Sequence, residues 1–206
     1  MPYTQHPLIL EGERVRLEPL DNVHLNDLLE ISAQEDVWKY LSLVGADRDQ
    51  LLSDLKSAQL KRLTGEQYPF AIIDKRTGKA IGSTRLYNTF PEHRKLEIGW
   101  TFYNRRYWGS GYNLECKLLL LTYCFETLKT VRVQLQTHEQ NHRSRAAIQK
   151  IGGKLEGILR NERIRPGGEV RNTAVFSIID SEWDEVKKML KEKVSTTFDK
   201  EATQNI

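Results

Sequence analysis

The chain has 206 residues, a net charge of +3, 39% apolar residues and 29% charged residues. This balance excludes a disordered chain and a membrane-spanning one, because no apolar run approaches the roughly 18 residues that a membrane helix needs. The first residues lack a basic segment followed by an apolar stretch, so we expect a cytoplasmic protein of one domain, and a charge this small suits an anionic ligand without favouring nucleic acid.

The first third of the chain predicts one strand followed by helices. Alternating apolar residues over positions 13–18 are typical of a strand with Val15 and Leu17 on one face. Asp21 or Asn22 can begin a helix that ends near position 32, and a short helical turn is expected at 36–41. Asp47 is the expected N-cap of a longer helix. Its apolar stripe comprises Leu51, Leu52, Leu55, Leu60 and Leu63.

The middle third predicts three strands. Residues 68–74 and 79–88 flank the turn at 75–78, which is a strong hairpin signal, and a third strand is expected at 95–103. Strict alternation along this third strand puts two sets of side chains on opposite faces. Leu96, Ile98, Trp100 and Phe102 belong to one set, and Lys95, Glu97, Gly99 and Thr101 to the other.

The last part alternates helices and strands. A glycine-containing loop after Tyr103 leads into an apolar helix at 113–129, and a strand follows at 131–137. Gly152-Gly153 ends a helix that runs from 141 to 151. Two strands at 154–164 and 172–179 and a helix from about 183 to 190 complete the predicted core, which extends from about 13 to 190. The polar residues 195–206 predict a frayed tail.

The order of these elements predicts an α/β fold with a mixed, mostly antiparallel sheet and helices on both faces. The unit from 95 to 137 is expected to be a right-handed parallel crossover. Cys116 and Cys124 are expected on one helix about 12 Å apart, which is too far for a disulfide. No further cysteine or histidine completes a zinc site beside them, so we predict two buried, unreactive thiols.

The loop before the long helix carries the strongest chemical signal. Gly109 and Gly111 can adopt backbone angles closed to other residues, and a helix N-terminus offers unpaired N–H groups to an anion. Arg105 and Arg106 add positive charge. The glycine pair alone fits a phosphate site and an ordinary strand-to-helix turn equally well.

Two other phosphate-binding motifs fit this loop poorly. No Gly-Lys-Ser/Thr sequence is present, which excludes a nucleoside-triphosphate P-loop. A dinucleotide fingerprint requires a third glycine at position 114, where the chain has Leu114, and it follows the first strand of a repeated βαβ unit rather than a later one.

The motif Arg106-x-x-Gly109-x-Gly111 matches the signature of the GNAT N-acetyltransferases, and the string from Tyr103 to Tyr112 is similar to the RimJ/RimL branch, which acetylates protein N-termini. Glu115, Asn141-x-x-Ser144 and Ile151-Gly152-Gly153 match this branch as well. The resemblance covers about 13–190. It implies the GNAT fold, with a sheet splayed between the fourth and fifth predicted strands, and an acyltransferase that uses acetyl-CoA.

The resemblance also implies how acetyl-CoA is bound. Main-chain N–H groups from Gly109 to Asn113 would bind the pyrophosphate, and the pantetheine arm would lie between the two splayed strands. A main-chain N–H between Trp100 and Phe102 would polarise the thioester carbonyl. The implied cofactor-binding residues are Phe102, Tyr103, Arg106, Gly109, Ser110, Gly111, Tyr112, Asn113 and Asn141.

Two catalytic residues are implied in the same way. Ser144 is the candidate proton donor to the departing CoA thiolate, with a purely structural helix serine as the alternative. Glu97 is the candidate general base, directly or through water, with a charged sheet residue as the alternative. Many members of the family have a tyrosine acid seven residues after the asparagine, where this chain has Ile148.

The expected acceptor is a primary amine, preferably a protein or peptide N-terminus. An α-amino group has a pKa of about 7.7–8.0 and a lysine side chain about 10.4, so lysine carries a handicap of roughly 3–4 kcal/mol in forming the neutral amine. A small amine such as an antibiotic, polyamine or amino acid is the nearest alternative. A non-catalytic module that senses acyl-CoA and an RNA-associated protein are the others, and a homodimer stays open.

Three further groups of side chains have both a functional and a structural interpretation. His138 and His142 flank a helix start but lack a third metal ligand at a useful spacing, so no metal is expected. Trp38 and Tyr40 either form an acceptor wall or pack in the core. The arginines of the late hairpin either attract an acidic peptide or RNA, or are surface charges: Arg160, Arg163, Arg165 and Arg171.

Overall fold

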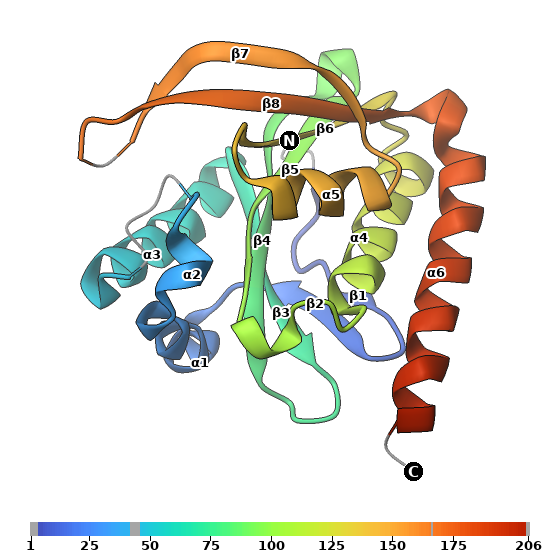
Figure 1. Cartoon of the computed structure of the whole chain (residues 1–206), viewed down its shortest axis with the longest axis horizontal. Coiled ribbons are helices and arrows are strands. Elements are labelled where there is room, and N and C mark those ends of the chain that lie inside the picture. The colour runs from blue at the N-terminus through green and yellow to red at the C-terminus, as the bar shows by residue number, and fades with distance from the viewer. Residues whose placement is uncertain (1–3, 42–45, 166, 205–206) are drawn as a thin grey trace.

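The computed structural model describes residues 4–41, 46–165 and 167–204. Its centre is an eight-stranded sheet with the order β1-β2-β3-β4-β5-β6-β8-β7 (Figure 1). The strands are β1 (Leu10–Glu11), β2 (Val15–Pro19), β3 (Gln67–Asp74), β4 (Ala80–Phe90), β5 (Lys95–Tyr103), β6 (Arg132–His138), β7 (Lys154–Ile164) and β8 (Val170–Ile179). The helices are α1 (Leu25–Leu29), α2 (Glu35–Trp38), α3 (Arg48–Thr64), α4 (Tyr112–Thr122), α5 (His142–Lys150) and α6 (Trp183–Gln204).

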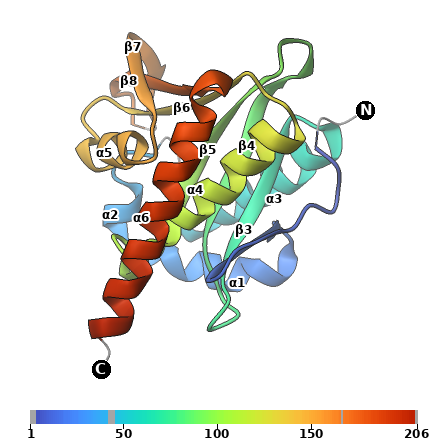
Figure 2. The ribbon, with the colours of Figure 1, turned by 90° about the vertical axis from the view of Figure 1, so that its right-hand side faces the viewer.

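The sheet confirms the predicted α/β architecture. β5 and β6 pair in parallel, as the crossover through α4 requires, and the other strand pairs of the described chain are antiparallel. Helices α1, α2 and α3 cover one face, while α4 and α6 lie together against the other (Figures 1 and 2). Each face therefore has its own apolar cluster, one around Leu28 and Leu51 and one around Leu120 and Phe176.

Helix α3 begins as the sequence predicts but buries fewer leucines. The Asp47 side chain accepts hydrogen bonds from the main-chain N of Asp49 and Gln50. Leu51 and Leu55 are fully buried, whereas Leu60 and Leu63 are 65% and 78% exposed. The prediction that Leu60 and Leu63 join the stripe is wrong, because at 100° per residue Leu60 points to the side of the helix opposite Leu51.

Helix α6 corrects the predicted frayed tail at 195–206. The helix continues through Ser195 to Gln204, so this segment is ordered secondary structure as far as it is described. Val194 and Phe198 belong to the core cluster, and the Arg14 guanidinium lies 3.7 Å from the Phe198 ring centroid. The apolar spacing at 186, 190, 194 and 198 carries the helix past the point where the composition becomes polar.

The two cysteines confirm the prediction of buried, unpaired thiols. Cys116 lies in α4, and Cys124 lies in the π-helical turn Tyr123–Thr127 that continues it. Burial raises the pKa of both thiols, which keeps them protonated. Among the described residues, no helix combines the length and the apolar character that a membrane span requires.

Candidate active site

The sheet opens between β5 and β6. Their parallel pairing joins Lys95–Glu97 to residues 132–134 and stops there, although β5 continues to Tyr103 and β6 to His138. On its other side β6 stays paired with β8 as far as His138. Two strands of the same sheet thus diverge over their C-terminal halves, as the resemblance implies.

A β-bulge in β5 lies beside this opening. Ser83 of β4 pairs with Phe102, but Arg85 pairs with Gly99, so Trp100 and Thr101 together oppose one residue of β4. Trp100 has a φ of 52°, in the left-handed region. The bulge reverses the alternation: Leu96 and Ile98 belong to the core cluster under α4, whereas Phe102 belongs to the cluster on the other face. The prediction of one continuous apolar face along β5 is therefore wrong.

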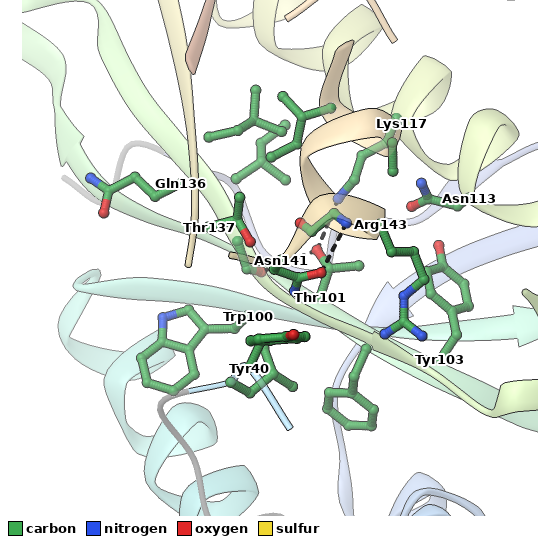
Figure 3. A pocket seen from close by; sticks show the side chains of 18 of the residues that line it. Tyr40, Trp100, Thr101, Tyr103, Asn113, Lys117, Gln136, Thr137, Asn141 and Arg143 are labelled. Carbon is green, nitrogen blue, oxygen red and sulfur yellow. Dashed lines mark hydrogen bonds between the residues drawn. The ribbon is translucent and has the colours of Figure 1, made fainter. Parts of the chain in front are cut away.

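A cavity of about 320 Å³ passes through the opening. Leu114 and Lys117 of α4 line it on one side of the sheet, and Val37 near the end of α2 lines it on the other. Figure 3 shows Lys117 and Asn113 above the strand that carries Thr101, with Trp100 and Tyr40 below it. The cavity thus connects the two faces of the sheet.

Lys117 is the functional candidate that sequence analysis missed. Its side chain is 4% exposed, and its Nζ donates to Thr101 Oγ1 at 2.9 Å and to Thr84 Oγ1 at 3.3 Å (Figure 3). Burial lowers the pKa of this amine, and no carboxylate pairs with it among the described residues. The available signal was a lysine three residues after Leu114 and four before Leu121, on the apolar stripe of the helix.

The glycine-containing loop leads into the cavity at the start of α4. Gly109 and Gly111 have φ values of 78° and 83°, which other residues adopt only under strain. Gly109, Gly111 and Asn113 line the cavity. None of the five main-chain amides from 109 to 113 donates a hydrogen bond within the described part of the chain. Five unpaired donors at a helix N-terminus are the kind of groups that bind an anion, so binding of the CoA pyrophosphate here stays a prediction.

The predicted cofactor-binding residues divide into two groups. Those that line the cavity are Phe102, Tyr103, Gly109, Gly111, Asn113 and Asn141. The side chains of Arg106, Ser110 and Tyr112 bond elsewhere: Arg106 stacks on Tyr107, Ser110 Oγ donates to the Tyr107 carbonyl at 2.6 Å, and Tyr112 donates to Asp74. Any part that Ser110 and Tyr112 play in binding would therefore be played by their main-chain amides.

Asp74 of β3 holds the glycine-containing loop in place through hydrogen bonds, and the sequence did not predict this role. This fully buried carboxylate accepts from the hydroxyls of Tyr107 at 3.0 Å and Tyr112 at 3.1 Å, one on each side of the glycines. Burial alone would raise the pKa of Asp74, but hydrogen bonds from Arg76, Tyr107, Thr77 and Tyr112 hold it below its usual value. The charged carboxylate therefore holds both ends of the loop.

Helix α5 brings Asn141 and Ser144 to the cavity. Asn141 Oδ1 accepts from the Ser144 main-chain N at 3.0 Å, so the asparagine caps the helix and leaves its Nδ2 group free of hydrogen bonds to described residues. The Ser144 hydroxyl also has no partner there, and Ser144 and Ile148 both line the cavity. Arg143 stacks on Trp108, with its guanidinium carbon 3.4 Å from the ring centroid.

Glu97 lies outside the cavity lining. Its Oε1 accepts from Asn88 Nδ2 at 3.1 Å and from the side-chain amides of Gln134 at 2.8 Å and Gln136 at 3.4 Å. Its strand partner Tyr87 does line the cavity. A base at Glu97 would therefore act through an intervening group, and this role stays a prediction.

Trp38 and Tyr40 were each predicted either to form an acceptor wall or to pack in the core, and the structure places them differently. Trp38 is 4% exposed and packs on Phe102 with ring centroids 4.9 Å apart, so it belongs to the core. Tyr40 lines the cavity and meets His138 edge-on at 5.3 Å. Burial, followed by the charges of Arg171 and Arg165, lowers the pKa of His138. No group of three or more candidate ligands that could hold a metal ion occurs among the described residues.

This combination of a splayed parallel pair, a bulge and a loop of unpaired amides can be compared with known proteins. Residues 14–154 match the family described as the acetyltransferase (GNAT) domain. The chain belongs to the GNAT acetyltransferase family. It is therefore an acyltransferase, and GNAT enzymes use acetyl-CoA as their donor.

Individual GNAT proteins agree with this assignment. The chain is 28% identical over 174 residues to a Bacillus subtilis protein named "Putative ribosomal N-acetyltransferase YdaF", covering 82% of this chain and 91% of that protein. A GCN5-related N-acetyltransferase from Brucella melitensis is 30% identical, with a TM-score of 0.85 over 92% of this chain and 86% of that one. RimJ of Mycobacterium smegmatis, solved with CoA-disulfide, shares the fold at 20% identity, with a TM-score of 0.79 over 91% and 95% of the two chains.

Proposed function

We propose that this GNAT enzyme transfers the acetyl group of acetyl-CoA to the α-amino group of a protein or peptide, by direct attack while both substrates are bound. One observation carries the proposal: a single cavity runs from the unpaired amides at 109–113 through the opening between β5 and β6 to the face covered by α2. Donor and acceptor can enter such a cavity from opposite sides of the sheet and meet within it.

The donor end suits the charged and polar parts of CoA. The pyrophosphate would accept from the amides between Gly109 and Asn113, where the helix dipole of α4 adds to the attraction. The pantetheine amides would pair with the edge of β5 beyond Glu97, which β6 leaves unpaired, and with Asn141 Nδ2. The arm would then run along the opening towards Thr101.

The chemistry would take place at the bulge. The amine nitrogen forms a bond to the acetyl carbon while the C–S bond breaks, so the amine loses one proton and the CoA thiolate gains one. A main-chain N–H between Trp100 and Phe102 and the Lys117 ammonium behind Thr101 would stabilise negative charge on the carbonyl oxygen. The Ser144 hydroxyl would give its proton to the thiolate and take up the proton that the amine releases, so that the serine ends neutral.

The preference for an N-terminus rests on proton chemistry. Roughly a tenth of α-amino groups are neutral at pH 7, whereas well under one lysine amine in a thousand is neutral. An α-amino acceptor needs no strong base, which fits a cavity with no aspartate or glutamate among its described lining residues. Glu97 lies outside this lining and accepts hydrogen bonds from side-chain amides. The name of the YdaF protein, a putative ribosomal N-acetyltransferase, supports a ribosomal protein as the acceptor.

An acceptor screen tests the proposal. Thiol release from acetyl-CoA is followed with peptides bearing free N-termini, with the same peptides blocked at the N-terminus and carrying one lysine, and with polyamines and aminoglycosides. We expect acceleration by the free N-termini and at least about 100-fold less by blocked lysine peptides. Faster thiol release with polyamines or aminoglycosides would show that the acceptor is a small amine and not an N-terminus. If no acceptor causes thiol release, the protein would instead be a module that only senses acyl-CoA.

A further inference from the structure

The far end of the cavity carries two opposed arginines. Arg163 of β7 and Arg171 of β8 are direct partners in the strand register, and both line the cavity. Like charges at directly opposed positions of a strand pair repel each other. Glu162 forms an ion pair with Arg163 at 2.8 Å and offsets part of this cost, and a negatively charged ligand bound between the two arginines would offset more of it.

These arginines lie away from the site for the CoA phosphates. Burial, followed by Glu97, raises the pKa of Tyr87, and the charges of Arg163 and Arg171 oppose this shift, which places both arginines near Tyr87. The strand partner of Tyr87 in β5 is Glu97. The phosphate loop begins after Tyr103, at the other end of the same strand, and six residues of extended chain span roughly 20 Å. The pyrophosphate therefore does not account for positive charge at this end.

Arg163 has donors to offer to a ligand. Both of its hydrogen bonds use Nε, which donates to the two carboxylate oxygens of Glu162 at 3.0 Å and 2.8 Å. Its two terminal NH2 groups make no hydrogen bond to the described residues, and Thr173 Oγ1 already donates to Glu162 at 2.9 Å. A planar guanidinium with two parallel N–H donors matches the geometry of a carboxylate.

Arg171 adds a buried charge to the same place. The residue is 6% exposed, and burial followed by the neighbouring Arg163 charge lowers the pKa of its guanidinium. A positive charge in such surroundings attracts an anion more strongly than one in water does. Arg160, on the same hairpin, is exposed and absent from the lining, so the two cavity arginines are distinct from general surface charge.

The composition of the cavity wall points the same way. Its charged residues are Lys117, Arg143, Lys150, Arg163 and Arg171, and none of its described residues is aspartate or glutamate. An amine that enters as an ammonium ion finds no anion to receive it. An acceptor that brings its own carboxylate avoids this mismatch and is neutral overall.

We propose that the acceptor carries a carboxylate near its amine, and that Arg163 and Arg171 bind this carboxylate on the far side of the bulge from the CoA loop. The inference rests on the proposed N-acetyltransferase function and narrows its substrate class. The carboxylate can belong to an acidic side chain close to a peptide N-terminus or to the α-carboxyl group of a free amino acid.

Two series of matched acceptors distinguish an acidic side chain of a peptide from the α-carboxyl group of a free amino acid. Peptides that begin Ser-Glu or Ser-Asp are compared with peptides that begin Ser-Gln or Ser-Asn, and free amino acids are compared with their amides, by thiol release from acetyl-CoA. A charge-assisted hydrogen bond predicts kcat/KM roughly 10- to 100-fold higher for the carboxylate member of one pair. Equal values in both series would overturn the inference while leaving the transferase function standing.

Three arginine variants test whether Arg163 and Arg171 cause the preference for acceptors with a carboxylate. Arg163→Gln and Arg171→Gln should remove the carboxylate preference, while Arg160→Gln, an exposed arginine of the same strand β7, should keep it. If the preference persists in both cavity variants, the assignment of these arginines is wrong. Acetyl-CoA affinity, measured by calorimetry, should be unchanged in all three, which distinguishes loss of the acceptor site from loss of the fold.

A binding measurement keeps the two proposals separate. The N-acetylated Ser-Glu peptide and its Ser-Gln counterpart are titrated by calorimetry into wild-type protein and into Arg163→Gln. Selective binding of the acidic peptide to the wild type supports the carboxylate site even if no acceptor releases thiol, an outcome that would overturn the transferase function alone. Equal binding of the two peptides would overturn the carboxylate site.

Discussion

At the scale of single residues, buried Lys117 lowers the stability of the folded protein and lies where it could take part in the reaction. A lysine that is 4% exposed and lacks a carboxylate partner among the described residues is costly to bury, and only the hydroxyls of Thr84 and Thr101 satisfy it. Proteins tolerate such residues mainly where function needs them. The position of Lys117 beside the bulge is consistent with a role at the thioester carbonyl.

The Lys117→Met variant should therefore be more stable and less active. Burial lowers the pKa of Lys117 in the folded protein, so between that pKa and the unfolded value near 10.5 the unfolded chain binds more protons. The stability of the wild type rises with pH through this window, and the cost of the charge is greatest below it. We expect the variant to gain about 1–3 kcal/mol at pH 6, and less towards pH 10.

Urea unfolding of both proteins between pH 6 and 10 measures this difference, and thiol release measures activity. At least a 10-fold drop in kcat with an unchanged Kd for acetyl-CoA is expected, since a charge near the developing oxyanion acts on the transition state. A variant that is less stable at pH 6, or fully active, would show that Lys117 is a structural residue.

Single residues were predicted unevenly. The left-handed conformation of Gly109 and Gly111 was predicted because it depends on the loop alone. The role of Asn141 in CoA binding came from the family resemblance and stays a prediction. Asp74 and Lys117 were missed because their partners are distant in sequence, 33 to 38 residues away for the tyrosines on Asp74 and 33 and 16 for the threonines on Lys117. A buried charged residue can be recognised as such only when its neighbours in the folded protein are known.

At the scale of elements, the loop and the start of α4 together form the proposed binding site for the CoA pyrophosphate. A Cβ atom at Gly111 would lie 2.8 Å from Thr197 of α6, so a substitution there would disturb α6 as well as the loop. A Cβ atom at Gly109 would meet nothing within 4 Å. Gly109 is therefore the better position for testing the loop.

The Gly109→Glu variant should bind acetyl-CoA at least 100-fold more weakly, because its carboxylate lies where the phosphates would lie. Gly78→Glu is a matched control: Gly78 has a φ of 71°, open space around its Cβ position and a place in the β3–β4 turn. Both variants carry the same backbone strain of roughly 1 kcal/mol. Calorimetry with acetyl-CoA tells them apart, and equal affinities would remove the loop from the donor site.

The bulge in β5 illustrates what an element's sequence conceals. The residues of β5 alternate regularly, so Leu96, Ile98, Trp100 and Phe102 look like one face. One extra residue at Trp100–Thr101 moves Phe102 to the other apolar cluster and turns Thr101 towards Lys117. The insertion depends on the pairing with β4, and no property of β5 alone reveals it.

At the scale of the whole molecule, the C-terminal helix α6 packs next to Gly111 of the glycine-containing loop. Phe198 is 6% exposed, its ring lies 3.3 Å from where a Gly111 Cβ atom would be, and its carbonyl accepts from Arg14 at 3.2 Å. The first strand region, the loop and the last helix thus meet at one place. The end of α6 therefore supports the loop.

Phe198→Ala should lower the free energy of unfolding by about 3 kcal/mol and weaken acetyl-CoA binding, because a buried aromatic ring next to the loop is lost. Leu63→Ala is the control: Leu63 is 78% exposed in α3, and its loss should change stability by less than about 0.5 kcal/mol. Chemical denaturation and calorimetry measure both effects. An unchanged stability of Phe198→Ala would mean that the end of α6 frays in solution, as its polar composition first indicated.

Local patterns settled the order of strands and helices, the parallel crossover and the loop at 109–113, because these depend on residues that are neighbours in the chain. Pairing between distant segments settled the rest. The parallel pairing ends at Glu97, which opens the cavity, and the β7–β8 register brings Arg163 opposite Arg171. The proposed donor end of the site can therefore be predicted from the sequence, whereas the proposed acceptor end depends on the pairing of strands that are distant in the chain.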